Sequence, residues 1–290
     1  MVDQHLLVDY ERKAIRELLR VSLAEDVGSG DITTHAIIDP DTSAKGIIVS
    51  HDAGVMAGGP VVDMLFELLG SDTRWTWHVE DGRWFEADTI LGEICTKAPV
   101  LLTGERLALN ILQRLCGIAF KTRQFVDKLA GTTVSLLDTR KTSPGMRVIE
   151  RYAVRMGGGT NHRFGLFDRI LIKENHLVFI KDPSEAVKMA RETYPHTIVE
   201  IEVTGEQDFR SALSATPDWI LLDNMSIEMM KRCVDIRNDT VGAVVRLEAS
   251  GGVTVNTIAD IASTGVEAIS AGALTHSAQW LDLSMDVHHG

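Results

Sequence analysis

Positively charged side chains gather in one stretch of an otherwise acidic chain. Between residues 140 and 173, eight lysines or arginines accompany only two acids, a local formal charge of +6, whereas the whole chain of 290 residues carries −12. Like charges held this close repel one another unless an opposite charge offsets them. Since arginine binds carboxylates and phosphates through paired hydrogen bonds, the stretch predicts a site for a polyanion. The eight cations are Arg140, Lys141, Arg147, Arg151, Arg155, Arg163, Arg169 and Lys173.

Three of these cations have a simpler explanation. Arg147, Arg151 and Arg155 follow one another at four-residue spacing, as residues on one face of a surface helix do. Ser143 and Pro144 before them are typical of a helix N-cap and first helical residue. We therefore expect these three arginines on a solvated helix face, met by acids from elsewhere in the chain. This explanation does not apply at the ends of apolar runs, where Arg140, Lys141, His162, Arg163 and Lys173 lie.

The composition describes a large globular protein. Hydrophobic residues make up 44% and charged residues 24% of the chain, which is ordinary for a protein with a sizeable core. No apolar run approaches the roughly 20 residues of a membrane span, and the charged amino terminus does not read as a signal peptide. Three widely spaced cysteines in no metal-binding pattern are expected to be reduced, which favours a cytoplasmic protein. The acidic balance argues against binding to nucleic acid or to a membrane surface.

The first 130 residues predict helices and a small α+β unit with an antiparallel sheet. Apolar spacing predicts a helix over 9–24. The polar segment 25–34 predicts a loop, and its acids suit a turn better than a metal site. A long helix is expected over 106–130, where Arg106 in the first turn opposes the helix dipole and is either paired locally or serves another purpose. The strands expected between them are 44–50, 75–79, 88–95 and 100–102, with a helix within 56–69.

From residue 134 onward, strand-like runs alternate with helical ones. Such repeated units predict a parallel sheet with right-handed crossovers. An open sheet and a closed barrel both fit this pattern. No glycine fingerprint of a dinucleotide fold follows a strand, so we favour a (β/α) barrel with fewer or more irregular units than the usual eight. The expected strands are 134–138, 169–173, 197–203, 219–223, 243–248 and 268–271, and the expected helices are 144–157, 182–193, 206–214, 226–238 and 254–263.

Polar side chains stand where the expected strands end. In such barrels the chemistry lies at the carboxyl ends of the strands. Five successive strand ends carry polar groups, cations on one side and carboxylates on the other, which predicts one shared ligand site. In chain order the residues at these ends are Arg140, Lys141, Lys173, Asn175, His176, Glu202, Asp223, Asn224, Glu248, Ser250, Gly251, Gly252 and Gly272.

Two of these groups suit a sugar phosphate. Ser250, Gly251 and Gly252 precede a helix expected near residue 253, and glycines let a phosphate approach backbone amides at a helix N-terminus. Glu202 and Asp223 suit ribose hydroxyls, Mg²⁺ or its waters, or a cationic sugar carbon. Each acid alone could instead be a solvated carboxylate or a partner of the cations.

A third group suits a polyanion. Arg140, Arg163 and Lys173, with His162 beside them, have the chemistry to bind a small dicarboxylate or a pyrophosphate. For His162 a structural role is an equal alternative. The site therefore suits a sugar phosphate at one end and a polyanion at the other, with carboxylates between them.

Motifs along nearly the whole chain resemble those of the quinolinate phosphoribosyltransferase family. They are EDVGSGDITT, AGGPV, GERLALNIL, DTRKTSPGMR, GGGTNHRFGLFDRILIKENH, VEIEV, LLDNMS, EASGGV and SAGALTHS. Glu174, where the family pattern has Asp, is a small departure that touches no expected catalytic residue. The resemblance implies an α/β fold, an irregular (β/α) barrel of the type II phosphoribosyltransferase kind with an N-terminal α+β sandwich domain. The implied segments are the sandwich over 1–118, the barrel over 119–275, and a last helix within 276–290 that returns to the N-terminal domain.

The resemblance also implies a reaction and an assembly. Quinolinate and phosphoribosyl pyrophosphate would give nicotinate mononucleotide, pyrophosphate and CO₂, a step of de novo NAD synthesis, with Mg²⁺ as cofactor. A homodimer or higher oligomer would share each active site between subunits, with Arg106 reaching into the partner's site. Neither nucleic acid nor a membrane is expected as a partner. The alternatives are a related pyrophosphorylase acting on another acceptor, and a barrel that binds anions without catalysis.

The same resemblance assigns roles to individual residues. Lys141, Glu202 and Asp223 would be catalytic, with Lys141 beside the pyrophosphate and the two acids beside the ribose and Mg²⁺, directly or through water. Quinolinate would be bound by Arg106, Thr139, Arg140, His162, Arg163 and Lys173. Phosphoribosyl pyrophosphate would be bound by Lys141, Glu202, Asp223, Ser250, Gly251, Gly252, Gly272 and His276.

Overall fold

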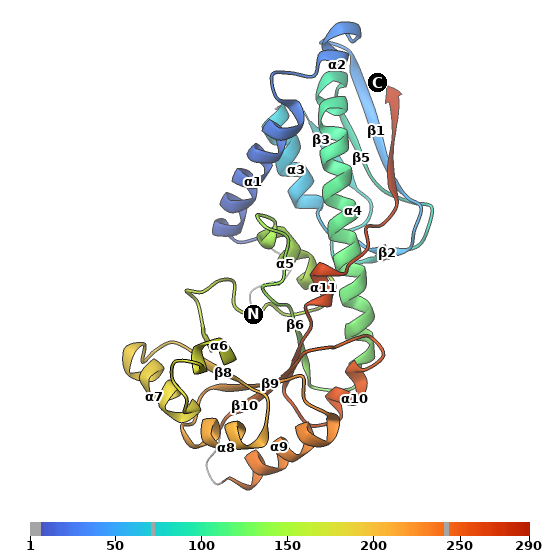
Figure 1. Ribbon diagram of the computed structural model, residues 1–290. Coiled ribbons are helices and arrows are strands. Elements are labelled where there is room, and N and C mark those ends of the chain that lie inside the picture. Colours follow the sequence, from blue (N-terminus) through green and yellow to red (C-terminus); the bar gives the residue numbers. More distant parts are fainter. Residues whose placement is uncertain (1–6, 71–72, 241–243) are drawn as a thin grey trace. The chain divides into compact units, whose positions relative to one another are not determined.

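The computed structural model describes residues 7–70, 73–240 and 244–290 (Figure 1). These residues form two compact units, each assembled from separate segments. The first unit holds the described residues up to Arg123 together with Thr142–Gly158 and Leu274–Gly290, and the second holds Gln124–Lys141 and Gly159–Ala273. The basic stretch of the sequence is thereby divided, with three of its cations in the first unit and five in the second. The linear boundaries expected at residues 118 and 275 stay a prediction.

An antiparallel sheet of four strands, in the order β12-β1-β5-β3, forms the first unit's centre. Buried and less buried residues alternate along β1, as in a sheet with one face on a core. In Figure 1 the red C-terminal strand lies beside β1, so the segment that returns to this unit is a strand and not the expected helix. The strands are β1 (Ser43–Ser50), β3 (Arg74–Trp77), β5 (Thr89–Lys97) and β12 (Leu283–His289), and a separate pair is β2 (Gly54–Val55) with β4 (Trp84–Phe85).

The long helix of this unit begins earlier than the sequence pattern predicts. The helix expected over 9–24 is confirmed, but the strand expected over 100–102 is wrong because α4 already begins at Ala98. Arg106 therefore lies in the third turn of α4, where the dipole of the helix N-terminus no longer acts on it. The helices are α1 (Asp9–Val27), α2 (Ile32–Ile37), α3 (Gly59–Leu69), α4 (Ala98–Lys128), α5 (Arg147–Met156) and α11 (Ala273–His276).

Two aspartates cap helices at the sequence motifs, since Asp31 lies within EDVGSGDITT and Asp81 binds the glycines of AGGPV. Asp31 accepts a hydrogen bond from the backbone N–H of Thr34 at 3.0 Å, so helix α2 starts inside the segment that was expected to be a loop. Asp81 accepts hydrogen bonds from the backbone N–H groups of Gly58, at 2.6 Å, and Gly59, at 3.2 Å, where α3 begins. Gly58 has a φ of +116°, a conformation that side chains other than glycine rarely adopt. These motifs therefore shape the first unit rather than a metal site.

A buried ion pair explains the residues around Ser143. Glu150 is fully buried and accepts hydrogen bonds from Arg114 Nε, at 3.0 Å, and Nη2, at 2.7 Å. Ser143 donates to the same carboxylate through its hydroxyl, at 2.8 Å, and its backbone N–H, at 3.1 Å. The helix begins only at Arg147, so the expected N-cap role of Ser143 is wrong. Its hydroxyl completes the partners of a buried charge instead.

The spacing of Arg147, Arg151 and Arg155 predicts a solvated helix face, and α5 forms such a face only in part. Arg155 meets the acid expected from elsewhere, since its guanidinium lies 2.8 and 3.0 Å from the two oxygens of Glu11. Arg151, however, is buried at 9% exposure. The solvated-face prediction is therefore wrong for Arg151, because α5 packs most of its circumference into the first unit.

The second unit is built on a parallel sheet of six strands. Its order is β6-β11-β10-β9-β8-β7, a cyclic sequence of neighbours with a gap between β6 and β7, as in an incomplete barrel. A single parallel bridge between Leu137 and Thr160 extends the edge at β6. The irregular barrel with fewer strands than eight is thereby confirmed. The strands are β6 (Ser135–Leu137), β7 (Ile170–Ile172), β8 (Val199–Val203), β9 (Trp219–Asp223), β10 (Arg246–Ser250) and β11 (Ala268–Ser270).

Helices follow the strands of the second unit. In β8 the aliphatic Val199, Ile201 and Val203 alternate with Glu200 and Glu202, so its two faces differ, whereas β9 buries Ile220, Leu221 and Leu222 in succession. Within the described residues, no helix combines the length and the apolar composition that crossing a membrane requires. The helices are α6 (Glu174–Leu177), α7 (Pro183–Thr193), α8 (Glu206–Ser214), α9 (Ile227–Asp239) and α10 (Ile258–Ala262).

Gly117 on α4 provides a test of the first unit's packing. A Cβ atom at this position would lie 1.9 Å from the carbonyl oxygen of Gln279, in the segment that leads to β12. Helix propensity alone predicts that Gly117→Ala stabilises the protein by about 1 kcal/mol. We expect the opposite sign, a loss of about 1–3 kcal/mol, because the backbone must move apart. Urea unfolding would measure it, with Gly205→Ala as the control because no atom lies within 4 Å of its Cβ. A stabilised Gly117→Ala variant would contradict this packing.

Candidate active site

The parallel register brings the predicted strand ends to one edge of the second unit's sheet. Ile172 lies opposite Ile201, so the residues that follow them, Lys173 and Glu202, are neighbours. Asp223 lies opposite Ser250. Side chains that are separated by up to 77 residues in the chain therefore line one edge, as the alternation of strands and helices predicts.

Carboxylates and one lysine form the centre of this edge. Lys173 Nζ makes an ion pair with Glu202, whose side chain is 7% exposed. Burial, together with a hydrogen bond that protonated Glu202 donates to Glu174, raises the pKa of Glu202 to about 7; Lys173 lowers it, and the charge of Asp223 raises it further. The three carboxyl groups thus carry more negative charge than Lys173 offsets. Oxygen ligands of this kind suit Mg²⁺, so Glu202 and Asp223 fit the metal that the sequence predicts.

A glycine turn lies at the next strand end. Gly251 and Gly252 have φ angles of +91° and +60°. A Cβ atom on Gly251 would lie 2.2 Å from Oδ1 of Asn224, so the turn leaves no room for a larger residue. The helix expected directly after it is wrong, because α10 begins only at Ile258, after a hydrogen-bonded turn. A phosphate here would meet glycine backbone amides without the dipole of an adjacent helix end.

Arg140, three residues after β6, and Arg163, three residues after the Thr160 bridge to β6, lie close to one another. Arg163 is 9% exposed, and burial, followed by the charge of Arg140, lowers its pKa. Asp138 is fully buried and accepts a hydrogen bond from the backbone N–H of His162 at 2.7 Å, which holds the loop after Thr160 against β6. Repulsion between neighbouring guanidinium groups at a partly desolvated position favours an anionic ligand.

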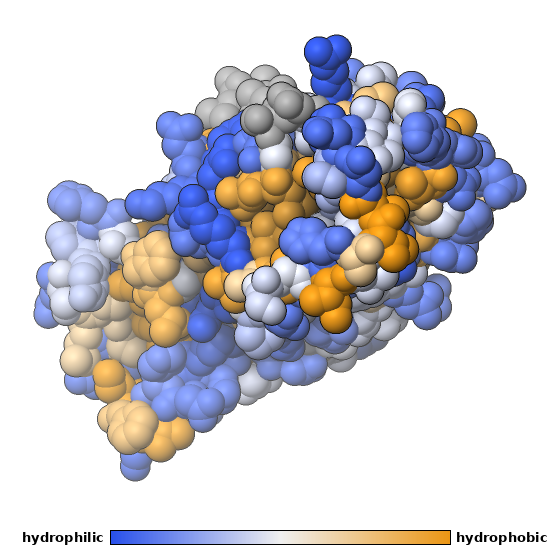
Figure 2. Space-filling model, turned by 90° about the horizontal axis from the view of Figure 1, so that it is seen from above, coloured by the Kyte–Doolittle hydropathy of each residue, from blue (hydrophilic) through white to orange (hydrophobic). Residues whose placement is uncertain are grey.

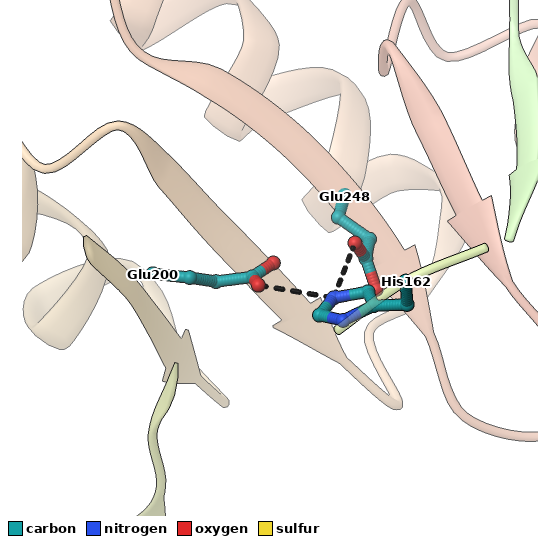
Figure 3. A group of neighbouring side chains, drawn as sticks. All are labelled: His162, Glu200 and Glu248. Atoms are coloured by element: carbon teal, nitrogen blue, oxygen red, sulfur yellow. Dashed lines mark ion pairs between the residues drawn. The ribbon is translucent and has the colours of Figure 1, made fainter. Parts of the chain in front are cut away.

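His162 lies between two buried glutamates (Figure 3). Its Nε2 is 3.0 Å from Glu200 Oε2 and 3.3 Å from Glu248 Oε2, and both carboxylates are fully buried, on β8 and β10. Burial disfavours the imidazolium, but the hydrogen bonds and charges of the two glutamates outweigh it and raise the pKa of His162 to about 9. The backbone N–H of Arg163 lies 2.7 Å from Nδ1 and donates to it in the neutral ring, so the neutral tautomer carries its proton on Nε2, toward the glutamates. Both ring nitrogens are therefore engaged within the unit.

His162, Glu200 and Glu248 have the spacing of a metal site, but a nearby cation already offsets the negative charge of the glutamates. The candidate ligand atoms of His162, Glu200 and Glu248 all lie within 4.8 Å of one another. Arg169 Nη1, however, lies 3.2 Å from Glu200 Oε2 and 3.4 Å from His162 Nε2, so a second cation there would be repelled. Burial, followed by the charge of Glu200, raises the pKa of Glu248 and favours its neutral form.

The structure places most of the predicted site residues in the second unit. Thr139, Arg140, Lys141, His162, Arg163, Lys173, Glu202, Asp223, Ser250, Gly251, Gly252 and Gly272 all belong to it. Arg106 and His276 belong to the first unit. Arg106 is exposed on α4, and among the described residues no carboxylate lies within ion-pair distance of it. Of the two explanations that the sequence left open for Arg106, local pairing is therefore excluded within the described part of the chain.

Sequence reasoning missed Glu200. The motif VEIEV places Glu200 and Glu202 two residues apart, and alternation along a strand puts both side chains on the same face of the sheet. That spacing was a signal for a second interior carboxylate. A glutamate in the middle of an apolar strand is otherwise uncommon, because it needs a partner when buried.

Two family models match the chain almost from end to end. The N-terminal domain of quinolinate phosphoribosyl transferase matches residues 31–116, and the C-terminal domain matches residues 118–286. The chain belongs to the quinolinate phosphoribosyltransferase family. The fold described above, an antiparallel sheet unit and an incomplete barrel, is the one that the resemblance implies.

Individual relatives agree with this family assignment. The probable nicotinate-nucleotide pyrophosphorylase (carboxylating) of Bacillus subtilis is 39% identical over 94% of this chain and 93% of its own length. The nicotinate-nucleotide pyrophosphorylase (carboxylating) of Mycobacterium leprae is 39% identical over 97% of this chain and 100% of its own. The structure of nicotinate-nucleotide pyrophosphorylase from Francisella tularensis superposes with a TM-score of 0.89 at 36% identity, covering 99% of this chain and 100% of that one.

The raised pKa of Glu202 predicts a pH dependence of stability. Folded Glu202 keeps its proton to about pH 7, whereas an unperturbed glutamate loses it near 4.5. Between these values the folded state binds more protons than the unfolded state, so the free energy of unfolding falls as pH rises through this window. Glu202→Gln has no such titrating group, so its free energy of unfolding should fall less with rising pH than that of the wild type. Urea unfolding in metal-free buffer between pH ~5 and ~7 would measure this dependence. The exposed Glu185→Gln is the control. If the free energy of unfolding of Glu202→Gln changes with pH as steeply as that of the wild type and of Glu185→Gln, the prediction is contradicted.

Proposed function

We propose that the chain transfers the phosphoribosyl group of phosphoribosyl pyrophosphate to quinolinate with loss of CO₂, giving nicotinate mononucleotide and pyrophosphate. The observation that carries this proposal is the set of groups at the carboxyl ends of the parallel strands. Arg140 and Lys141 follow β6, the glycine turn follows β10, and Asp223, Glu202 and Lys173 stand at the ends of β9, β8 and β7. Cations, a glycine turn and carboxylates suit a dicarboxylate acceptor, a phosphate and a ribose. The unpaired cysteines support a reducing compartment, and we propose the cytoplasm.

The cationic end would bind quinolinate. Arg140 and Arg163 have the planar donors that bind carboxylates bidentately. Lys173 would exchange part of its ion pair with Glu202 for a substrate carboxylate. His162 would contribute through its position under Arg163, because both of its ring nitrogens have partners. Thr139 accepts a hydrogen bond from the backbone N–H of Lys141 at 3.1 Å, which holds the cationic loop in place.

The carboxylate group would hold the ribose and Mg²⁺. Glu202 and Asp223 would be its ligands, directly or through water, and a divalent cation would favour the ionised form of Glu202. Bound Mg²⁺ would offset part of the negative charge that leaves with pyrophosphate. Lys141, exposed at the end of β6, would contribute to the same charge balance. Ser250, Gly251, Gly252 and Gly272 would hold the 5-phosphate.

The proposed reaction has two steps, transfer of the sugar to the ring nitrogen and then loss of CO₂. The ring nitrogen of quinolinate attacks the anomeric carbon of the sugar as its bond to the pyrophosphate oxygen breaks. Positive charge develops on the sugar, and the carboxylates of Glu202 and Asp223 stabilise it in a partly desolvated site. The bond from the ring to the neighbouring carboxylate then breaks, because the positively charged nitrogen stabilises the electron pair that remains on the ring carbon until that carbon takes up a proton. No general base is needed for the attack.

Release of CO₂ from carboxyl-labelled quinolinate tests this function. We expect release only when phosphoribosyl pyrophosphate and Mg²⁺ are both present, and loss of one electrostatic group, in Asp223→Asn, should lower turnover by ~10²–10³-fold. Product without CO₂ would indicate another acceptor. Tight quinolinate binding without turnover would indicate an anion-binding protein and would refute the enzymatic proposal.

We further propose that two copies of the chain share each active site, with the partner subunit's Arg106 binding a quinolinate carboxylate. On the face seen in Figure 2, orange groups of apolar side chains interrupt a mostly blue surface. Exposed apolar residues occur in both units, and such groups often mark an interface. In the first unit they include Ile32, at 80% exposure, and Ile37, at 74%; in the second unit they include Leu166, at 73%, Phe167, at 81%, and Phe179, at 86%.

Mixed dimers would test the shared site. Arg106→Ala and Lys173→Ala should each fold and each lack activity. In a mixed dimer both substitutions fall in one site and the other site is intact, so an equal mixture after subunit exchange should recover roughly a quarter of wild-type activity. Differently tagged subunits would verify exchange by co-purification. Complete exchange without recovered activity would show that Arg106 and Lys173 act in the same subunit.

A further inference from the structure

The amino ends of the parallel strands enclose a cavity at the edge opposite the candidate active site. The cavity has a volume of about 360 Å³. Ser135, Trp219, Arg246 and Ala268, which line it, are the first residues of β6, β9, β10 and β11. Arg169, directly before β7, also lines it. The strands pair in parallel, so all five residues lie at the amino edge, away from the carboxyl ends that carry Lys173, Glu202 and Asp223.

Two arginines contact the same tryptophan in this cavity. The guanidinium carbon of Arg169 is 5.6 Å from the ring centroid of Trp219, and that of Arg246 is 5.4 Å from it. Contact with an aromatic ring orients a guanidinium but does not neutralise its charge. Arg169 has Glu200 as a partner at 3.2 Å. In the described ranges no carboxylate lies within ion-pair distance of Arg246.

The remaining charged groups around the cavity leave it cationic. Arg163 and His162, which the resemblance assigns to quinolinate, also line it. Asp168, the one acid among the described residues that line the cavity, accepts hydrogen bonds from the backbone N–H groups of Phe164, at 2.5 Å, and Gly165, at 2.9 Å, and so closes its own turn. An excess of positive charge at the mouth of a cavity in an acidic protein attracts anions.

We propose that this amino-edge cavity binds a small oxyanion of the phosphate class, held by the guanidinium groups of Arg169 and Arg246 beside the ring of Trp219. Guanidinium forks match the oxygens of such an anion. The volume suits a single phosphate-sized group with a few waters, at the small end of ligand pockets. The anion shares Arg169 with Glu200, while Arg246 has its guanidinium available for it. Arg169, Arg246 and Trp219 stand at the amino ends of the strands, away from Lys173, Glu202 and Asp223. Arg163 and His162 of the expected quinolinate group also line this cavity, but the proposal does not depend on the proposed reaction.

The fluorescence of Trp219 provides a direct readout of binding. Sodium phosphate would be titrated into the full-length protein, with sodium chloride at matched ionic strength as the reference. The same titration of Trp219→Phe subtracts the contribution of the four other tryptophans. We expect a saturable change with phosphate that chloride does not reproduce and that Trp219→Phe lacks.

Substitutions at the two edges of the sheet would assign the signal to this cavity. Arg246→Gln should weaken phosphate binding about tenfold or more, because it removes charged hydrogen bonds to the anion. Arg246→Lys should weaken it less, since the charge remains and only the fork is lost. Arg232→Gln is the matched control, an exposed arginine of the same unit that is paired with Glu206 at 2.5 Å. Lys141→Ala, at the carboxyl edge, should leave the Trp219 signal unchanged.

Three results would each overturn the proposal. The first is the absence of any saturable, Trp219-dependent change at millimolar phosphate. The second is an equal change with chloride, or an equal loss in Arg232→Gln, which would indicate general screening of charge. The third is loss of the signal in Lys141→Ala but not in Arg246→Gln, which would assign it to the carboxyl edge. None of these results bears on CO₂ release, so failure here leaves the proposed reaction standing.

Discussion

Parallel pairing of the six strands is the constraint on which the candidate site depends. Parallel strands need long crossover connections, so residues that meet at one edge are far apart in the chain. The register of β9 with β10 sets Asp223 opposite Ser250, and the register of β7 with β8 sets Ile172 opposite Ile201. A slip of one residue along β8 would turn Glu200 and Glu202 toward the helices and bring Ile201 inside. The acidic centre of the site and the charge network beneath it would be lost together.

Buried charge is the second constraint. A small number of side chains in the barrel interior offset one another's charges. Glu200 and Glu248 are fully buried, which is tolerable only with partners or a proton. His162 lies between them and Arg169 contacts Glu200, so cations from the basic stretch stabilise carboxylates of the strands. Part of the positive charge that the sequence assigns to a ligand is therefore used inside the protein. Arg140 remains at the carboxyl edge for an anion, and its charge acts on Arg163, which also lines the amino-edge cavity.

The motifs of the chain serve structure and chemistry in different proportions. Asp31 and Asp81 cap helices in the first unit, and Ser143 completes the partners of a buried ion pair. None of these roles could be separated from catalysis by residue type alone, since aspartate and serine occur in both. Lys173, Glu202 and Asp223 have functional surroundings because their strands end at the same edge, a property of the pairing and not of the motifs.

The sequence by itself determined the alternation of strands and helices, the parallel sheet, the polar groups at its carboxyl edge and the family. These properties depend on local periodicity and on residue types, which a linear pattern records. Only the tertiary structure decided how the basic stretch is divided, with Arg147, Arg151 and Arg155 in the first unit and Arg163 and Arg169 in the second. It also decided that α4 starts at Ala98, that α10 starts after the glycine turn, and that Glu200 partners His162. The reason is that long-range packing sets where helices begin and which charges become buried, and neither is encoded within a few residues of the position concerned.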